Sequence, residues 1–378
     1  MLGIRWLSVQ PGSGYGDASE AYLVGLRRHG VPVTWTPLGW PSPIWDAPYG
    51  PVGHDGVNPG RHRDIAGRSI PHDTVLVSSV PLWHEQLALE ARGRRLVAYS
   101  TWETDRLPTA SVSTLNRYDR VLVPSRFNAE VFASSGVRRP VHVVPHIAHP
   151  AVPAPAPGSR SPFVFYVVAT WTSRKALSDV LRAYVAAFTS ADDVRLIVHT
   201  TRKDLIATEQ RDHEHGVQTT TMVSVARALA GRRNPPAIAL STSRCSRAEI
   251  DALHASADCF VLLSRGEGWG LGAFDAAAFG RPVIVTGWGG TPEFLPNDYP
   301  YLVDYTLIPT EDDGPDLWWR PEPDERWAKA DVEHASRLMR RVYEHREEAC
   351  VWGSRLQAGV AATYGERRVT ARLLQALA

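Results

Sequence analysis

The residues best placed to do chemistry lie in one stretch, Ser264–Thr286, where two carboxylates accompany a series of alternating glycines. Glu267 lies among these glycines, and Asp275 follows it after seven intervening residues. Glycines let the backbone approach a ligand closely, and the helix that should follow directs free amide groups toward negative charge. Short apolar runs flank the stretch at 259–264 and 281–286, as expected for buried parallel strands. We therefore expect both carboxylates to face one pocket at the carboxyl end of a sheet.

A pair of cations, Arg174 and Lys175, follows the apolar run 163–169 and supplies the opposite charge. Loops that follow parallel strands lie at the same edge of a doubly wound sheet, so the cations and carboxylates can meet in one crevice. Cations and helix amides hold phosphates and neutralise a leaving phosphate, while carboxylates accept hydrogen bonds from vicinal hydroxyls. This combination suits a nucleotide-diphosphate sugar. The alternative for the two cations is a solvated helix start.

The amino-terminal region carries a second glycine loop, formed by Gly12, Gly14 and Gly16, between a predicted strand at Ile4–Val9 and a predicted helix that ends at Gly30. This order is the start of a βαβ unit. The loop could cradle a phosphate or a sugar, but a purely structural turn explains the same glycines equally well.

Length and element order predict an α/β protein of two domains. The chain has 378 residues, 44% of them apolar and 21% charged, which is enough for two hydrophobic cores. Strand and helix candidates alternate in both halves, and the proline-rich segment 151–162 separates them as a linker. We expect one domain in residues 1–150 and the other in 163–365.

Charge and cysteine content exclude some classes of partner and suggest a location. The formal net charge of +1 gives no support for binding to nucleic acid or an anionic membrane. The three cysteines are widely spaced, which fits a reducing cytoplasm better than a disulfide framework. No apolar run reaches the roughly 18 residues of a transmembrane helix. We therefore expect a cytoplasmic protein without a transmembrane segment.

Three consecutive segments, Glu267–Asp275, 276–284 and 289–293, resemble the signature of family 4 of the retaining glycosyltransferases. Weaker similarities to the same family run over almost the whole chain, and include the first glycine loop and the segment 102–108. The resemblance implies the GT-B fold, in which two Rossmann-like domains with parallel sheets face each other across a cleft. It also implies that the carboxy-terminal helix, 366–378, crosses back to the amino-terminal domain.

The resemblance assigns roles to individual residues. It implies a catalytic set of Glu267, Arg174 and Lys175, with Glu267 contacting hydroxyls of the donor sugar. Two departures from the family pattern stand out: Asp275 replaces a glutamate at the ribose contact, and Thr170 replaces an arginine of the diphosphate clamp. The implied donor-binding residues are Gly14, Gly16, Gly268, Trp269, Gly270, Leu271 and Asp275, and the acceptor-side candidates are Trp102, Glu103 and Ser125.

Tryptophan supports the same interpretation at two positions. The chain has 13 tryptophans, and an indole face can stack on a sugar ring or fill a core. Packing is the better explanation for most of them. We expect Trp102 and Trp269 to be the two exceptions.

The implied activity is transfer of a glycosyl group from a UDP- or GDP-sugar to a hydroxyl or amine of a small molecule or glycan, with retention of configuration. The resemblance implies no obligatory cofactor and no metal, because side-chain cations take that role. Two alternatives remain: a GT-B phosphorylase or epimerase, and a non-catalytic nucleotide-sugar-binding subunit. The sequence does not predict the base, the donor sugar, the acceptor or the oligomeric state.

Overall fold

The computed structural model describes residues 2–38, 62–91, 93–149, 161–202, 204, 220–310 and 321–378. The chain forms two compact units, residues 1–149 with 363–378, and residues 150–362. Most of the predicted linker 151–162 lies outside the described residues.

The first unit contains a six-stranded parallel sheet in the order β2-β1-β3-β4-β5-β6. Its strands are short apolar runs buried on both faces, and Leu76, Val97 and Val121 are fully buried. The strands are β1 (Ile4–Val9), β2 (Val33–Leu38), β3 (Thr74–Ser78), β4 (Arg95–Tyr99), β5 (Arg120–Val123) and β6 (Val141–Val143), and the helices are α1 (Gly14–Arg28), α2 (His84–Ala88), α3 (Thr109–Leu115), α4 (Arg126–Ser134) and α12 (Glu366–Leu377).

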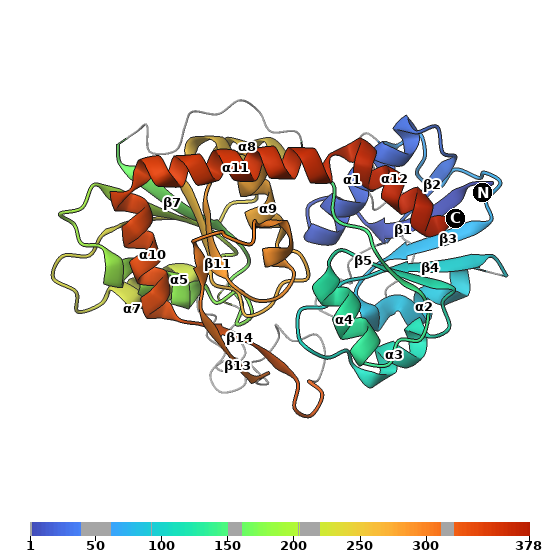
Figure 1. Cartoon of the computed structure of the whole chain (residues 1–378), viewed down its shortest axis with the longest axis horizontal. Coiled ribbons are helices and arrows are strands. Elements are labelled where there is room, and N and C mark those ends of the chain that lie inside the picture. Colours follow the sequence, from blue (N-terminus) through green and yellow to red (C-terminus); the bar gives the residue numbers. More distant parts are fainter. Residues whose placement is uncertain are drawn as a thin grey trace. The chain divides into compact units, whose positions relative to one another are not determined.

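The second unit repeats this plan with the strand order β12-β11-β10-β7-β8-β9, again all parallel (Figure 1). Together the two sheets confirm the predicted α/β class. The strands are β7 (Phe163–Val168), β8 (Val194–His199), β9 (Ala237–Ser241), β10 (Cys259–Leu262), β11 (Val283–Thr286) and β12 (Leu302–Val303), and the helices are α5 (Leu177–Ala187), α7 (Thr221–Leu229), α8 (Arg247–Ser256), α9 (Leu271–Ala278), α10 (Val332–Glu344) and α11 (Arg346–Tyr364).

An antiparallel hairpin, β13 (Tyr305–Pro309) and β14 (Arg326–Ala330), was not predicted from the sequence. Residues 328–330 belong to β14 and not to the helix that follows. Helix α10 begins only after Asp331, whose side chain accepts a hydrogen bond from the backbone N–H of His334 at 2.9 Å. This cap fixes the start of the helix.

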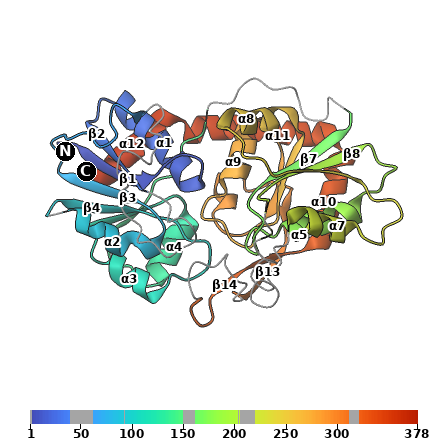
Figure 2. The ribbon, with the colours of Figure 1, turned by 180° about the vertical axis from the view of Figure 1, so that it is seen from behind.

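The carboxy-terminal helix α12 packs against α1 in the first unit, as both views of the ribbon show (Figures 1 and 2). Leu373 and Leu377 of α12 are fully buried. The two helices lie close together at Gly25 of α1, where a Cβ atom would lie 2.2 Å from Oγ1 of Thr370. A glycine in the middle of α1 is therefore required by packing, not by local conformation.

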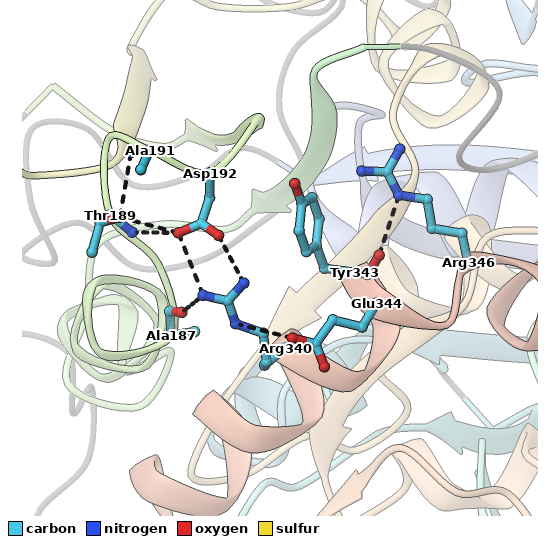
Figure 3. Close-up of polar contacts among 8 residues, drawn as sticks. All are labelled: Ala187, Thr189, Ala191, Asp192, Arg340, Tyr343, Glu344 and Arg346. Atoms are coloured by element: carbon cyan, nitrogen blue, oxygen red, sulfur yellow. Dashed lines mark hydrogen bonds and ion pairs between the residues drawn. The ribbon is translucent and has the colours of Figure 1, made fainter.

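A cluster of charged and aromatic residues ties α10 to the segment between α5 and β8 (Figure 3). Nη1 of Arg340 contacts Oδ1 of Asp192 at 2.8 Å, and Nη2 donates to the backbone oxygen of Ala187 at 2.6 Å. The guanidinium of Arg340 also lies 4.7 Å from the ring centre of Phe188. The hydrogen bond from Arg340 is the main cause that holds the pKa of Asp192 below its usual value.

We predict that Gly25→Ala destabilises the first unit although alanine favours helix by about 1 kcal/mol. The added methyl group overlaps Thr370 and must push α12 away from α1. Gly359→Ala in α11 is the matched control, because nothing lies within 4 Å of its Cβ position. It should raise the free energy of unfolding, by about 0.5–1 kcal/mol. Chemical denaturation of both variants tests this, and equal effects would contradict the packing argument.

We predict that Arg340→Ala lowers the free energy of unfolding of the second unit by about 2 kcal/mol, because it removes an ion pair, a backbone contact and a cation–π contact together. The control is Arg117→Ala, since the pair between Arg117 and Glu85 has side chains 56% and 68% exposed. That variant should change stability by no more than about 0.5 kcal/mol. Urea denaturation measures the free energy of unfolding of both variants. A loss as small as that of the control would show that the cluster around Arg340 does not stabilise the unit.

Candidate active site

The two predicted loops meet because their strands are neighbours. β10 pairs with β7 in parallel, with Cys259 opposite Phe165 and Phe260 opposite Tyr166. The loop 263–270 after β10 and the loop 169–176 after β7 therefore leave the same edge of the sheet.

The cations and the first carboxylate contact each other directly. Nζ of Lys175 lies 2.5 Å from Oε1 of Glu267, and Nη1 of Arg174 lies 3.7 Å from the same oxygen. Nη1 of Arg174 also donates to the backbone oxygen of Gly266 at 2.8 Å, while the N–H of Arg265 donates to the backbone oxygen of Arg174 at 2.7 Å. The structure thus joins Glu267, Arg174 and Lys175 into one cluster.

Glu267 is 8% exposed, and its ionisation reflects two opposing effects. Burial raises the pKa of this carboxyl group, but the nearby charges of Lys175 and Arg174 and a hydrogen bond from Lys175 outweigh burial and leave the pKa below its usual value. Glu267 is therefore a carboxylate at neutral pH. As an anion it can only accept hydrogen bonds, which is what contact with sugar hydroxyls requires.

Glycines shape the loop that carries Glu267. Gly270, with φ of +87°, is the residue before α9, and its Cβ atom would lie 2.5 Å from Oγ1 of Thr291. A Cβ atom on Gly290 would lie 2.0 Å from the backbone oxygen of Gly268, and the N–H of Gly290 donates to the backbone oxygen of Glu267 at 2.7 Å. The segment 289–291 therefore braces the loop backbone to backbone.

Helix α9 begins at Leu271, as the glycine pattern predicted, and no side chain caps its first turn. An uncapped amino terminus suits an anion, because its free amide groups carry the positive end of the helix dipole. The contact of the 268–271 amides with a diphosphate remains a prediction.

Asp275 lies on α9 and is 6% exposed. Its Oδ2 accepts a hydrogen bond from Nη1 of Arg247, the first residue of α8, at 2.9 Å. This pair was not predicted from the sequence, because the two residues lie on different helices. The predicted ribose contact of Asp275 therefore involves a side chain already held by an arginine.

The glycine loop of the first unit has a structural explanation of its own. Gly14 is the first residue of α1, and the N–H of Gly16 donates to Oγ of the capping residue Ser13 at 3.2 Å. A Cβ atom on Gly16 would lie 2.0 Å from the backbone oxygen of Gln10. The turn thus needs glycine here with or without a ligand, and donor binding by Gly14 and Gly16 remains a prediction.

The two tryptophans expected to meet sugar are packed into protein. Trp102 is 1% exposed, and its Nε1 donates to Oγ1 of Thr104 at 2.7 Å and to the backbone oxygen of Arg106 at 2.6 Å. Trp269 is 2% exposed and lies against Phe274 and Phe294, with ring centres 5.2 and 5.6 Å away. Both indole rings are thus packed in the protein core, and a contact of either residue with a sugar remains a prediction.

Ser125 also proves to be structural. It is fully buried, and its Oγ accepts a hydrogen bond from the N–H of Asn128 at 3.1 Å as the cap of α4. Its assignment to the acceptor side remains a prediction. Glu103 is half-buried and is the acceptor-side candidate that retains some exposure.

The hairpin adds residues to the site that the sequence did not indicate. The N–H of Ala328 in β14 donates to the backbone oxygen of Arg265 at 2.8 Å. The Arg265 guanidinium lies 5.1 Å from the ring centre of Trp327, which is fully buried. The hairpin therefore supports the residue two positions before Glu267.

Solved structures with the same fold are glycosyltransferases of the GT-B class. A sucrose-phosphate synthase from Thermosynechococcus elongatus has a TM-score of 0.65 and 14% identity, and the match covers 99% of this chain and 98% of that one. The lipopolysaccharide outer core galactosyltransferase WaaB has a TM-score of 0.62, 12% identity and coverage of 100% and 99%. At these identities the likeness establishes the fold.

S. aureus TarM, solved with UDP, has a TM-score of 0.57 and 10% identity. The match covers 80% of this chain, which spans about 55% of the length of TarM. No curated protein matches the sequence.

The sequence of the second unit is similar to a known family. Residues 161–316 match the family model described as glycosyl transferases group 1. This segment contains Arg174, Lys175, Glu267 and Asp275, so the site lies in the part of the chain that is similar to this family. The resemblance expected from the signature is confirmed.

The described residues include neither a metal-binding cluster nor a membrane-spanning helix. Among them, no group of three or more His, Cys, Asp or Glu side chains is placed to hold a metal ion. Likewise, none of the helices within the described part of the chain is long and apolar enough to cross a membrane.

We predict that the ion pair between Lys175 and Glu267 stabilises the fold at pH values above the usual glutamate pKa of about 4.3. This contribution should be lost as the pH falls from that value through the lower pKa of folded Glu267. In Lys175→Met the carboxyl group stays buried without its closest cation, so its folded-state pKa should rise and the loss of stability on acidification should become smaller or reverse. Urea denaturation between pH 3 and 7 measures the shift. Glu267→Gln is the control, because it should lack the transition, and identical pH profiles for all three proteins would contradict the coupling.

Proposed function

We propose that this protein is a retaining glycosyltransferase that moves a glycosyl group from a nucleotide-diphosphate sugar to an acceptor hydroxyl or amine. The observation that carries the proposal is the contact between Lys175 and Glu267, at 2.5 Å, within the domain that matches the group 1 family. The contact supports the proposal because a cation suited to phosphate lies beside a carboxylate suited to sugar hydroxyls, at the carboxyl edge of the sheet.

Each member of the cluster has a distinct role in the proposed reaction. Lys175 and Arg174 bind the diphosphate and neutralise the charge that grows on it as the glycosidic bond breaks. The first amides of α9 support the same phosphates. Glu267 accepts hydrogen bonds from the donor sugar and orients the anomeric carbon.

Retention is proposed to follow a front-face route. The oxygen of the leaving phosphate accepts the proton of the acceptor while the acceptor attacks the face that the phosphate leaves. This route assigns no protein nucleophile. It needs no metal either, since two side-chain cations compensate the phosphate charge.

The donor class is proposed from the site and from the structural neighbours. TarM and a pneumococcal O-GlcNAc transferase, GtfA, were both solved with UDP. We propose a UDP- or GDP-sugar as donor and a small molecule or glycan as acceptor, in a protein of the cytoplasm.

We predict that Lys175→Ala and Glu267→Ala each lower the transfer rate by about 10²–10³-fold, as removal of a transition-state charge contact does. The assay measures nucleoside diphosphate released from a panel of UDP- and GDP-sugars. Asp298→Ala is the control, because Asp298 belongs to an exposed pair with Arg355 in the same unit. Unchanged turnover in either site variant would refute the assignment.

Product analysis separates the proposal from its alternatives. NMR of the product should show the donor's anomeric configuration kept. Turnover that needs only phosphate or no acceptor would indicate a phosphorylase or epimerase. Donor binding without transfer or hydrolysis would indicate a binding subunit.

A further inference from the structure

The ion pair between α8 and α9 uses only part of the hydrogen-bonding capacity of its two residues. Nη1 of Arg247 donates to Oδ2 of Asp275 at 2.9 Å, and Nε of Arg247 donates to Oδ1 of Asp251 at 2.7 Å. Within the described residues, Nη2 of Arg247 and Oδ1 of Asp275 are buried and have no hydrogen-bond partner. An acceptor and a donor are thus both unsatisfied at one ion pair.

Unsatisfied buried atoms are costly, so this arrangement is poorly explained by stability alone. Each such atom has lost its contact with water without gaining a hydrogen bond, and the cost is larger when the atom is charged. Arg247 is moreover the first residue of α8, where a cation faces the positive end of the helix dipole. The capping box of Ser246 and Glu249 stabilises that helix start without Arg247.

A ligand hydroxyl pair would satisfy both atoms together. In a vicinal diol, one hydroxyl donates to a carboxylate oxygen while the other accepts from a guanidinium. Asp275 is the residue that the resemblance places at the ribose of the donor, but its side chain is one methylene shorter than the usual glutamate. A second contact from Arg247 compensates for the shorter reach.

We propose that Arg247 is a second residue for recognition of the donor's ribose, with Nη2 donating to one hydroxyl while Oδ1 of Asp275 accepts from the other. The inference rests on the proposed function, because it assigns the nucleoside part of the same donor. Arg247 binds the donor here and also positions Asp275 through Nη1.

The test is the affinity for UDP and GDP, compared with their 2′-deoxy and 3′-deoxy analogues, by calorimetry on the full chain. The unmodified protein should prefer the ribonucleotide over at least one analogue by about tenfold or more, as loss of a hydrogen bond to a charged group predicts. Arg247→Lys keeps a cation for Asp275 but lacks the second nitrogen. It should lose about tenfold in ribonucleotide affinity and leave the affinity for that analogue unchanged.

Two further variants sharpen the test. Asp275→Asn keeps the volume of the side chain and removes the carboxylate, so it should lose the same preference for the ribonucleotide. It tests the proposal even if Arg247→Lys fails to fold. Arg182→Lys is the matched control, because Arg182 pairs with an aspartate, Asp179, on α5 of the same unit. It should retain the preference of the unmodified protein. In turnover, Arg247→Lys should raise the KM of the donor more than it lowers kcat.

Several outcomes would overturn the inference while leaving the proposed function intact. One is binding of UDP or GDP without any preference over the deoxy analogues. Another is an Arg247→Lys variant that is less stable but keeps the preference, which would make the pair structural. A third is a changed choice between UDP and GDP at constant ribose preference, which would place Arg247 at the base. Failure to bind any nucleotide or nucleotide sugar would instead refute the proposed function and this inference together.

Discussion

A buried carboxylate needs a compensating charge, and this requirement organises the second unit. Glu267 is ionised although it is almost fully buried, because Lys175 and Arg174 reach it from the neighbouring strand's loop. That contact is only available if β7 and β10 are adjacent and parallel. The ionised state of Glu267 therefore depends on the order of the central strands.

The glycines around Glu267 are needed for packing within the protein as well as for any contact with a ligand. Gly290 approaches Gly268 so closely that no side chain fits, and Gly270 adopts a left-handed conformation just before α9. The backbone of 289–291 thus fixes a loop that would otherwise have little to restrain it. The hairpin strand β14 adds a further restraint at Arg265. A site built on such supports is preorganised before a substrate arrives.

The sequence was sufficient for most of the fold and for the central cluster. Apolar runs bounded by glycine located the strands on both sides of Glu267, and loops at the carboxyl ends of parallel strands brought Lys175 to it. The burial of Trp102, Trp269 and Ser125 was not predicted, because a polar or aromatic residue near a predicted loop can equally be buried by neighbours that are distant in sequence. The pair of Arg247 with Asp275 could not be foreseen for the same reason, since it depends on how two helices pack.

The close packing of α12 on α1 has a consequence for synthesis of the chain. The first unit is discontinuous, built from residues 1–149 and 363–378, whereas the second occupies one uninterrupted segment, 150–362. A growing chain therefore completes the second unit before the helix that covers α1 exists. Until α12 is released from the ribosome, the surface around Gly25 remains uncovered, so the domain that starts first is the last to be finished.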